Sequence, residues 1–407
     1  MKVGFVSFRI AGTDGVSLEA ERWRTILTRM GHEVTFVAGE LDRSGLLIPE
    51  LHFFHPDVVR AHQMVVDNNV NYKKIEKEIF AMAGVIEGKL REQFRRFKFE
   101  KLVVANAFSL PMHFPLAVAL ERVIAEYRIP TVSRNHDFWW ERPRYLKSHC
   151  FEFFKRWFPP ANPLITHVTI NSLAQKELKF RRGLESTVVW DSFDFAGRAK
   201  KQDAYSGHFR EDFGLGKKDI IFLQATRIVQ RKQIELAVEL VEKLNDSRVV
   251  LVLAGRDGDE SGDYLQKIKR LAKKAGIRHK FIEKWVNGTR KIKEGKRVYT
   301  LWDCFANCDW VTYPSETEGF GNQFVEAVYF KKPIVVNRYP VYKADIEPLG
   351  FETVTINGKI ARGQIDKTRR WMEDSTGTTK IVEKNFALGV KYFAFEVVEK
   401  KLEGLGF

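Results

Sequence analysis

Two carboxylates, Glu318 and Glu326, bracket a glycine-bearing turn in this chain, with seven residues between them. The turn follows an apolar run, residues 308–314, that predicts a buried strand, and it precedes a helical pattern that ends before Lys331. A strand that leads into a helix N-terminus presents unpaired backbone N–H groups and the positive end of the helix dipole, and both attract an anion. Because phosphate suits the N–H groups and sugar hydroxyls suit the carboxylates, the segment predicts a site for a sugar nucleotide.

A pair of cations, Arg227 and Lys232, follows another predicted strand, on a turn that leads into a helical pattern. Two cations at the C-terminal end of a strand suit a diphosphate, because they neutralise the charge that builds up on a leaving phosphate. Taken alone, the segment is explained equally well as solvated surface charge.

Three further segments stand at predicted strand ends in the first half of the chain. Gly12 and Gly15 lie between the first strand and the first helix, where glycine permits close approach of the backbone to a ligand. Their spacing is not GxGxxG and no acidic residue ends the second strand, which disfavours a dinucleotide oxidoreductase. In residues 135–142, His136 stands beside two tryptophans and an arginine, which suits sugar stacking and an anion, although tryptophan packing in the core is an equal alternative. Residues 106–113 are a candidate lining for an acceptor pocket.

Strand and helix patterns alternate along the whole chain, which predicts parallel sheets covered by helices on both faces. Strands are expected at residues 2–8, 33–38, 101–105, 131–134, 167–171, 186–190, 219–225, 249–254, 281–283, 309–313 and 333–337. Helices are expected at residues 17–30, 72–97, 114–127, 233–244, 264–275 and 374–403. The periodicity lapses around residues 193–207, where we place the domain boundary.

The chain has 407 residues, of which 44% are hydrophobic, and this is enough for two domains of ordinary size. No apolar run approaches the roughly 18–20 residues that span a bilayer, and the N-terminal residues have no signal-peptide pattern. Three cysteines are too few for a disulfide framework or a zinc site, so we expect buried free thiols and a cytoplasmic protein.

The net charge of +15 is divided as +7 for residues 1–200 and +8 for residues 201–407, which excludes a basic tail. The excess is compatible with an anionic ligand, an anionic membrane surface or nucleic acid. It is also compatible with the solvated surface of a heat-tolerant protein.

The order of these motifs resembles that of the family 4 retaining glycosyltransferases (glycosyl transferases group 1), and the likeness covers nearly the whole length. The shared pattern is a glycine-rich first loop, a histidine in the first domain, Arg-x4-Lys and Glu-x7-Glu. The resemblance implies the α/β GT-B fold, in which two doubly wound Rossmann-like domains face a central cleft. On this basis residues 1–195 form the acceptor-binding domain, residues 196–380 form the nucleotide-sugar-binding domain, and residues 381–407 form a C-terminal helix that packs back toward the first domain.

The resemblance also implies roles toward a nucleotide-diphosphate sugar donor, a GDP- or UDP-hexose, with no metal ion required. Glu326 would bind the ribose. Glu318, with the backbone of Gly319, Phe320 and Gly321, would contact the donor sugar. Asn322 and Gln323 would supply N–H groups near the diphosphate. Arg227 and Lys232 would stabilise the departing diphosphate, and the loop from Gly12 to Gly15 would approach it from the other domain. His136 would lie near the sugar and the acceptor hydroxyl.

Two departures from the family pattern stand out. Lys232 is followed by Gln233, where the family often has glycine, so we expect this helix start to be less open. Residues 191–194 read Asp-Ser-Phe-Asp where the family often has Asn-Gly-Val-Asp, so we expect a different hinge and assign Asp191 no binding role.

We therefore expect a hexosyltransferase that transfers a hexose, with retention of configuration, to a small acceptor. The basic charge, Arg142 and Arg144 favour an anionic acceptor. The overall resemblance to solute-making members of the family implies an acceptor of the glycerate or glucosylglycerate type, as in compatible-solute synthesis. Three alternatives stay open. A monotopic membrane glycosyltransferase would use the basic, aromatic segment at residues 80–99. The other two are a nucleotide-sugar epimerase of the same fold and a nucleic-acid binder, although the even spread of charge disfavours nucleic acid. The nucleobase, the hexose and the oligomeric state cannot be inferred from one sequence.

Overall fold

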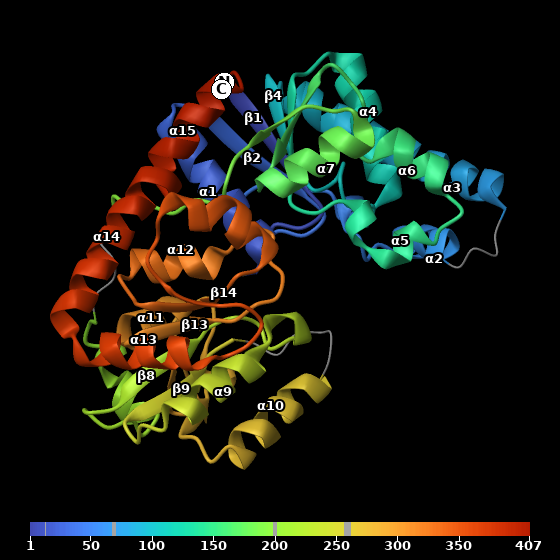
Figure 1. Ribbon diagram of the computed structural model, residues 1–407. Helices are drawn as coiled ribbons and strands as arrows, with labels where there is room; N and C mark the ends of the chain where they lie inside the picture. Colours follow the sequence, from blue (N-terminus) through green and yellow to red (C-terminus); the bar gives the residue numbers. More distant parts are fainter. Residues whose placement is uncertain (13, 67–70, 198–201, 256–261) are drawn as a thin grey trace. The chain divides into compact units, whose positions relative to one another are not determined.

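The computed structural model describes residues 1–12, 14–66, 71–197, 202–255 and 262–407. These residues form two compact units. Unit 1 comprises Met1–Asp191 together with Glu396–Phe407, and unit 2 comprises Ser192–Phe395 (Figure 1). Each unit contains one parallel sheet with helices packed around it, as the alternation of strand and helix patterns predicts.

Unit 1 has a seven-stranded parallel sheet in the order β3-β2-β1-β4-β5-β6-β7. The strands are β1 (Lys2–Ser7), β2 (Glu33–Ala38), β3 (Leu46–Leu47), β4 (Lys101–Ala105), β5 (Thr131–Asn135), β6 (Ile165–Thr169) and β7 (Ser186–Val188). The strand order reverses between β1 and β4, which are paired along Val3–Val6 and Lys101–Val104. In open α/β sheets, such a reversal leaves a crevice at the C-terminal ends of the two strands, and ligands bind there.

The helices of unit 1 are α1 (Gly15–Arg29), α2 (Pro56–Val66), α3 (Tyr72–Phe97), α4 (Phe114–Tyr127), α5 (Pro143–Leu146), α6 (Phe151–Trp157), α7 (Ser172–Arg182) and α15 (Phe395–Gly404). Helix α3 shows why such segments are helical. Its buried residues Ile79, Ala83, Ile86 and Leu90 recur at three- and four-residue spacing, so they form one apolar stripe in the core of unit 1.

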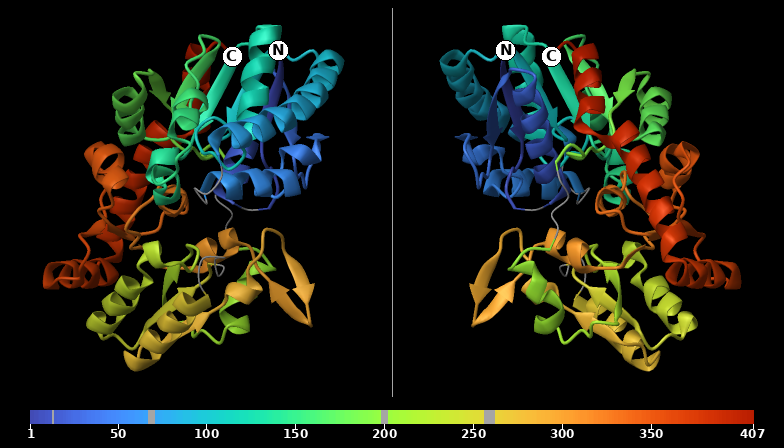
Figure 2. Two further views of the ribbon diagram at one scale, coloured as in Figure 1. Left: turned by 90° about the vertical axis from the view of Figure 1, so that its right-hand side faces the viewer. Right: turned by 90° about the vertical axis from the view of Figure 1, so that its left-hand side faces the viewer.

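Unit 2 has a six-stranded parallel sheet in the order β10-β9-β8-β13-β14-β15. The strands are β8 (Ile220–Gln224), β9 (Val249–Leu253), β10 (His279–Phe281), β13 (Trp310–Tyr313), β14 (Ile334–Asn337) and β15 (Val354–Ile356). The helices are α8 (Phe209–Asp212), α9 (Ile234–Leu244), α10 (Gly262–Lys274), α11 (Leu301–Asn307), α12 (Asn322–Tyr329), α13 (Arg362–Glu373) and α14 (Ser375–Phe393). The strand order reverses between β8 and β13, so their C-terminal ends form the corresponding crevice. A separate hairpin, β11 (Lys291–Lys293) and β12 (Lys296–Val298), stands clear of this sheet (Figure 2).

The contacts near residue 191 explain where the two units divide. Asp191 is ion-paired with Arg134 of unit 1, whereas Phe193 N donates to Phe393 O and the Phe193 ring packs on Tyr329, both in unit 2. The compact units therefore separate between residues 191 and 192, a few positions before the expected division at 195/196.

The C-terminal segment differs from the single helix expected over residues 374–403, and from its placement as one piece over residues 381–407. Ala394 is extended (φ −69°, ψ 156°) and ends α14, which belongs to unit 2. A Cβ at Gly389 would meet Phe195 at 2.7 Å, which shows how closely α14 packs there. Helix α15 belongs to unit 1, where Lys401 Nζ donates to Val188 O at 2.7 Å.

Several shorter elements were not expected from the sequence, among them α2, α7, α13, β15 and the hairpin. The expected strand at residues 167–171 ends at Thr169, because Asn171 turns away and accepts a hydrogen bond from Ala174 N at 2.7 Å, capping α7. All three cysteines are buried and unpaired, as expected. Over the described ranges, no helix combines the length and apolar character needed to cross a membrane.

Candidate functional site

Two loops of unit 2 lie side by side at the reversal between β8 and β13. Glu316 N donates to Arg231 O at 2.9 Å, and Arg231 Nη1 donates to Thr317 O at 3.2 Å. The structure thus joins two motifs that the sequence placed far apart, since Lys232 and Glu318 are 86 positions from each other along the chain. Adjacency of the two strands produces this contact.

The joined loops hold a buried ion pair. Lys232 Nζ binds Glu318 Oε1, and both side chains are about nine-tenths buried. Arg231 Nη1 approaches Glu318 Oε2 at 3.4 Å. Burial raises the pKa of Glu318, but the charge of Lys232, its hydrogen bond and the charge of Arg231 together outweigh burial and hold that pKa below its usual value, so the carboxylate stays ionised. An ammonium group has three hydrogen-bond donors, so Lys232 can remain bonded to Glu318 and still donate hydrogen bonds to a phosphate.

The second predicted cation, Arg227, has a different environment. Its side chain is exposed, and it forms no ion pair with the described residues. Burial lowers the pKa of Lys232 most, and the charges of Arg231 and then of Arg227 lower it further, whereas Glu318 raises it. Arg227 therefore lies near the pair without forming an ion pair with it. The motif therefore supplies one buried, paired cation and one exposed cation, and Arg231 is a third cation that the sequence motif did not identify.

Helix α12 begins at Gly321, where the backbone has φ 140°. Gly321, the cap residue, has no side chain that could occupy the N–H groups of this helix start. Tyr339 Oη donates to Phe320 O at 2.7 Å and holds the turn from the end of β14. Gln323 is buried in the first turn, and neither Oε1 nor Nε2 has a partner among the described residues. The turn therefore combines a helix start whose cap residue is glycine with a buried amide that has no hydrogen-bond partner among the described residues.

The other predicted residues of this segment lie around the same turn. Asn322 and the half-buried Glu326 are one helical turn apart and share a side of α12. The ring of Phe320 is buried against the ring of Phe393, with 5.5 Å between the ring centroids, so the Phe320 side chain belongs to the core. Gly319 directly follows Glu318, so the predicted donor-side residues lie on one continuous turn.

The backbone at Gly321 yields a direct test. An added Cβ would lie 2.3 Å from Tyr339 Oη, and φ 140° strains any other residue. We expect Gly321→Ala to lower the free energy of unfolding by about 2–4 kcal/mol, because it combines backbone strain with a steric clash. Gly363→Ala, in an open position of α13, is the control and should be neutral or slightly stabilising. Urea unfolding of both variants checks this, and equal stabilities would contradict it.

The first loop of unit 1 is already occupied by a carboxylate. Asp14, which the sequence motif did not single out, caps α1 by accepting hydrogen bonds from Val16 N and Ser17 N, each at 3.1 Å. Gly12 has φ 75° and its N–H donates to Asp42 Oδ2 at 2.7 Å. Gly15 is the first residue of α1. An anion at this helix start would take the place that the Asp14 carboxylate now holds.

His136 follows β5 and contacts Asn106, which follows β4. Asn106 Oδ1 lies 2.8 Å from His136 N and 3.0 Å from His136 Nδ1. The Nε2 atom of the ring is buried and has no partner among the described residues. Burial, followed by the charge of Arg134, lowers the pKa of His136 well below its usual value, so the imidazole is neutral.

Arg134, two residues before His136, is the centre of a buried charge network that was not expected from the sequence. Its Nη2 binds Glu19 Oε1 at 3.0 Å and Asp191 Oδ1 at 2.9 Å, and its Nη1 donates to Val189 O at 3.0 Å. The guanidinium also lies 4.7 Å from the centre of the Trp23 ring. Nothing in the local pattern marks a β-strand arginine as buried, because its partners come from α1 and from the segment after β7.

The same network makes stability depend on pH. Burial, together with repulsion from Asp191, raises the pKa of Glu19 from 4.5 to about 7. Between these values the folded protein binds more protons than the unfolded chain, so the contribution of Glu19 to stability falls as pH rises from 4.5 to 7. We expect Glu19→Gln to remove up to about 3 kcal/mol of this decline. Urea unfolding at pH 5 and pH 7.5 measures it, with Glu33→Gln, at an exposed position, as the control.

Trp139, Trp140 and His113 have structural roles. Trp139 and Trp140 are buried, with Trp139 Nε1 donating to Phe158 O at 2.9 Å and Trp140 stacked on Phe138 at 4.4 Å. These contacts agree with the alternative that the two tryptophans pack in the core. His113 is fully buried and caps α4, because its Nδ1 accepts from Leu116 N at 3.1 Å. It therefore does not line an open acceptor pocket.

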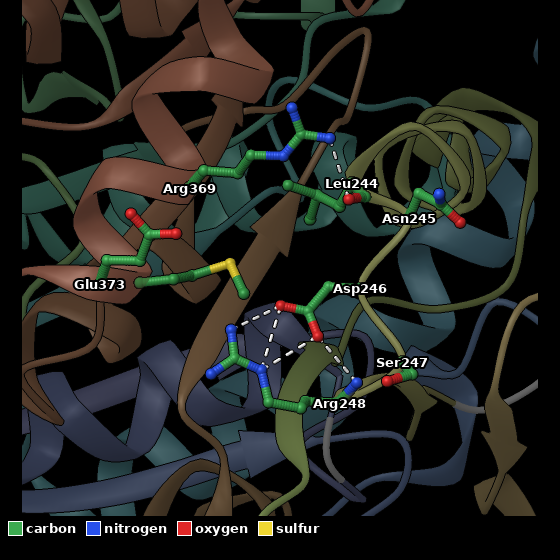
Figure 3. A pocket seen from close by; sticks show the side chains of 8 residues that line it. Leu244, Asn245, Asp246, Ser247, Arg248, Arg369 and Glu373 are labelled. Atoms are coloured by element: carbon green, nitrogen blue, oxygen red, sulfur yellow. Dashed lines mark hydrogen bonds and ion pairs between the residues drawn. The ribbon is translucent and has the colours of Figure 1, made fainter.

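A pocket of about 390 Å³ lies elsewhere in unit 2, where α9 ends and β9 begins (Figure 3). Its lining includes Asp246, Arg248, Arg369 and Glu373. Arg369 Nη2 donates to the carbonyls of Lys243 and Leu244 at 3.1 and 3.0 Å, so it satisfies the C-terminal end of α9. The pocket is therefore at the N-terminal edge of the sheet, opposite the loops that carry Lys232 and Glu318.

Comparison with known proteins identifies the family. Residues 207–385 match the model of the glycosyl transferases group 1. The chain is 35% identical over 384 residues to the mannosylglucosylglycerate synthase of Petrotoga mobilis, covering 88% of this chain and 87% of that protein. It is 31% identical over 443 residues to the synthase of the same name from Thermotoga maritima, covering 98% of each.

Among solved structures, HepE from Anabaena in complex with UDP and glucose has a similar fold, with a TM-score of 0.65 at 14% identity over 99% of this chain and 98% of that one. The fold class expected from the sequence is confirmed by this likeness and by the two parallel sheets. Together with the identity to the two synthases over most of the chain, these findings show that the protein belongs to the group 1 glycosyltransferases of the GT-B fold.

Proposed function

We propose that the protein transfers a hexose from a nucleoside-diphosphate sugar to a small, anionic acceptor, with retention of configuration. The observation that carries this proposal is the buried Lys232–Glu318 pair beside the start of α12, where the cap residue is Gly321. A cation for the diphosphate and a carboxylate for sugar hydroxyls stand next to each other there. The names of the two related synthases support a mannosyl donor and a glucosylglycerate acceptor.

In the proposed reaction, the bond between the anomeric carbon and the diphosphate oxygen breaks. The acceptor oxygen bonds to the same carbon, and its proton leaves with the nucleoside diphosphate or to solvent. Lys232 and Arg227 neutralise the charge that develops on the departing diphosphate. This places the electrostatic work on side chains, so we expect full activity in EDTA.

The remaining motif residues bind the donor in this proposal. Gln323 and Asn322 face the diphosphate at the start of α12, and the unpartnered amide of Gln323 supports this. The backbone from Gly319 to Gly321 contacts the sugar with Glu318. In unit 1, the loop from Gly12 to Gly15 approaches the diphosphate, which takes the place of the Asp14 carboxylate at the start of α1. His136 accepts a hydrogen bond from a substrate hydroxyl.

Glu326 binds the ribose hydroxyls in this scheme. We expect Glu326→Ala to raise the dissociation constant for the donor about 10- to 100-fold, because charge-assisted hydrogen bonds are lost, and to leave kcat nearly unchanged. Calorimetric titration with GDP-mannose and UDP-glucose, combined with initial rates, separates these effects. Glu383→Ala is the control, since Glu383 is exposed on α14 and pairs with Lys331. Unchanged affinity for every donor would argue against the ribose assignment.

Product analysis tests the function itself. Purified protein is incubated with GDP-mannose, GDP-glucose or UDP-glucose and with glucosylglycerate, glycerate or the neutral analogue glucosylglycerol. Transfer to glucosylglycerate but not to glucosylglycerol supports an anionic acceptor, and the anomeric coupling of the product tests retention. No transfer to either acid would overturn the acceptor assignment. Donor incubated alone reveals epimerisation, the alternative reaction of this fold.

The structure does not favour the membrane alternative at residues 80–99. Phe94 and Phe99 are buried, Arg91 pairs with Glu87 and Glu126, and Arg95 donates to Tyr127 Oη. The aromatic side of this helix therefore packs in the core of unit 1. We propose a cytoplasmic location, supported by three buried, unpaired thiols.

A further inference from the structure

We infer that Asn106 is a positioning residue for His136. It holds the imidazole in the neutral tautomer with the proton on Nδ1, so that Nε2 presents its lone pair to a hydroxyl group. The inference rests on the proposed function only where it names a substrate hydroxyl as the partner of Nε2. The tautomer itself is a property of the free protein.

The tautomer follows from the two contacts of one Asn106 atom. Backbone N–H can only donate, so the side-chain atom 2.8 Å from His136 N is the amide oxygen and not the amide nitrogen. The same oxygen lies 3.0 Å from His136 Nδ1. Because an amide oxygen only accepts, Nδ1 carries a hydrogen. In a neutral ring, Nε2 is then a bare acceptor.

The surroundings keep the ring neutral. Protonation would place a hydrogen on Nε2, which is buried and has no acceptor among the described residues. Arg134, two residues earlier, adds a positive charge that disfavours an imidazolium. The carboxylates of this network, Glu19 and Asp191, are both engaged by Arg134. A hydroxyl donor therefore suits Nε2, whereas a cationic donor would be repelled.

The backbone of Asn106 fixes its side chain in this position. Asn106 has φ 62°, a left-handed conformation that asparagine tolerates better than most residues. Its N–H donates to Arg134 O at 2.9 Å, and its carbonyl accepts from Ser109 N at 3.1 Å. The residue is buried at the end of β4, beside the strand reversal where ligands bind in this fold class. The sheet thus holds Asn106 in place, and Asn106 in turn orients the ring of His136.

The first test is direct observation of the tautomer in protein labelled with 15N-histidine, with His136→Gln used to assign the signal. We expect His136 in the wild type to be the Nδ1–H tautomer and not to titrate between pH 6 and 9. Asn106→Ala should populate the Nε2–H form. Asn106→Asp keeps an acceptor but adds negative charge, so its His136 should become protonated within that range. A wild-type Nε2–H tautomer, or titration near pH 6.5, would overturn the inference.

The second test uses transfer from GDP-mannose to glucosylglycerate. We expect Asn106→Ala to lower kcat about 10- to 100-fold, as one misaligned buried hydrogen bond would, with a much smaller change in donor KM. Asn106→Asp should recover turnover at high pH, with its acid limb moved to higher pH. If Asn106→Asp has the pH profile of the wild type, the residue is merely structural. Asn162→Ala, elsewhere in unit 1, is the control and should leave the His136 signal and kcat unchanged. If the wild type transfers nothing, the proposed function fails, whereas the tautomer experiment still decides the role of Asn106.

Discussion

Replacing Lys232 with alanine is expected to lower kcat about 100- to 1,000-fold, with a much smaller change in donor KM. The charge on the diphosphate grows as it leaves, so a cation that neutralises it acts mainly in the transition state. Lys232 is the buried cation of the site, and its position is fixed by Glu318 and by the hydrogen-bonded loops. Initial-rate kinetics over a range of donor concentrations measure the two parameters. A large rise in KM with normal kcat would show that Lys232 only holds the ground state.

The control for these kinetics is Lys243→Ala, which replaces an exposed lysine on α9 that pairs with Glu239.

A second control separates activity from folding, because removal of Lys232 leaves Glu318 buried with Arg231 alone. We expect the removal of Lys232 to reverse the pH dependence of stability that Glu318 contributes. In the wild type its lowered pKa stabilises the folded state above pH 4.5, and this stabilisation is lost as pH falls. In the variant, burial dominates and raises the pKa, so stability increases as pH falls. The double variant Lys232→Met, Glu318→Gln should lack both pH effects, which would show that they come from this ion pair.

Replacing Arg134 with methionine is expected to lower the free energy of unfolding by about 3–5 kcal/mol at pH 8. The variant leaves Glu19 and Asp191 buried next to each other without their shared cation. The loss should be smaller at pH 5.5, because Glu19 then binds a proton and the repulsion disappears. Urea unfolding at the two pH values measures the difference.

The controls for this prediction distinguish charge from packing. Arg156→Met, at an exposed position of α6, should change stability little. Adding Glu19→Gln to Arg134→Met should recover part of the loss, since it removes one of the two unpaired charges. A pH-independent loss in Arg134→Met that Glu19→Gln does not change would instead assign the effect to lost packing on Trp23.

Family membership confirms the expected enzyme class, a hexosyltransferase. The α/β architecture was predictable because each signal for it is local. All five residues of β4 are buried, and its apolar run is visible in the sequence without knowledge of its neighbours. The apolar stripe of α3 likewise needs only the helical period, and the expected bounds of this helix match those observed. Chain segments whose signals are weaker, such as the two-residue β3 and the short α5, were not predicted.

The candidate site was predictable only in parts. The motif residues stand at strand ends, and the glycine at position 321 signalled a special backbone conformation that the structure shows. In contrast, the capping of α1 by Asp14 changes the meaning of the Gly12–Gly15 loop, and no spacing rule distinguishes such a cap from an open helix start. The two tryptophans after His136 were equally compatible with stacking on a sugar and with the core, because burial depends on segments that pack from elsewhere.

By itself, the sequence determined the family, the two doubly wound halves and the order of the motifs, because these depend on residue types and on periodicities within a few turns or strands. Only the tertiary structure decided which charges meet. The order of the strands brings Lys232 to Glu318 across 86 positions, and it brings Arg134 between Glu19 and Asp191. The energy of a charge depends on its burial and on its partners, and both are set by strand adjacency, which no local pattern encodes.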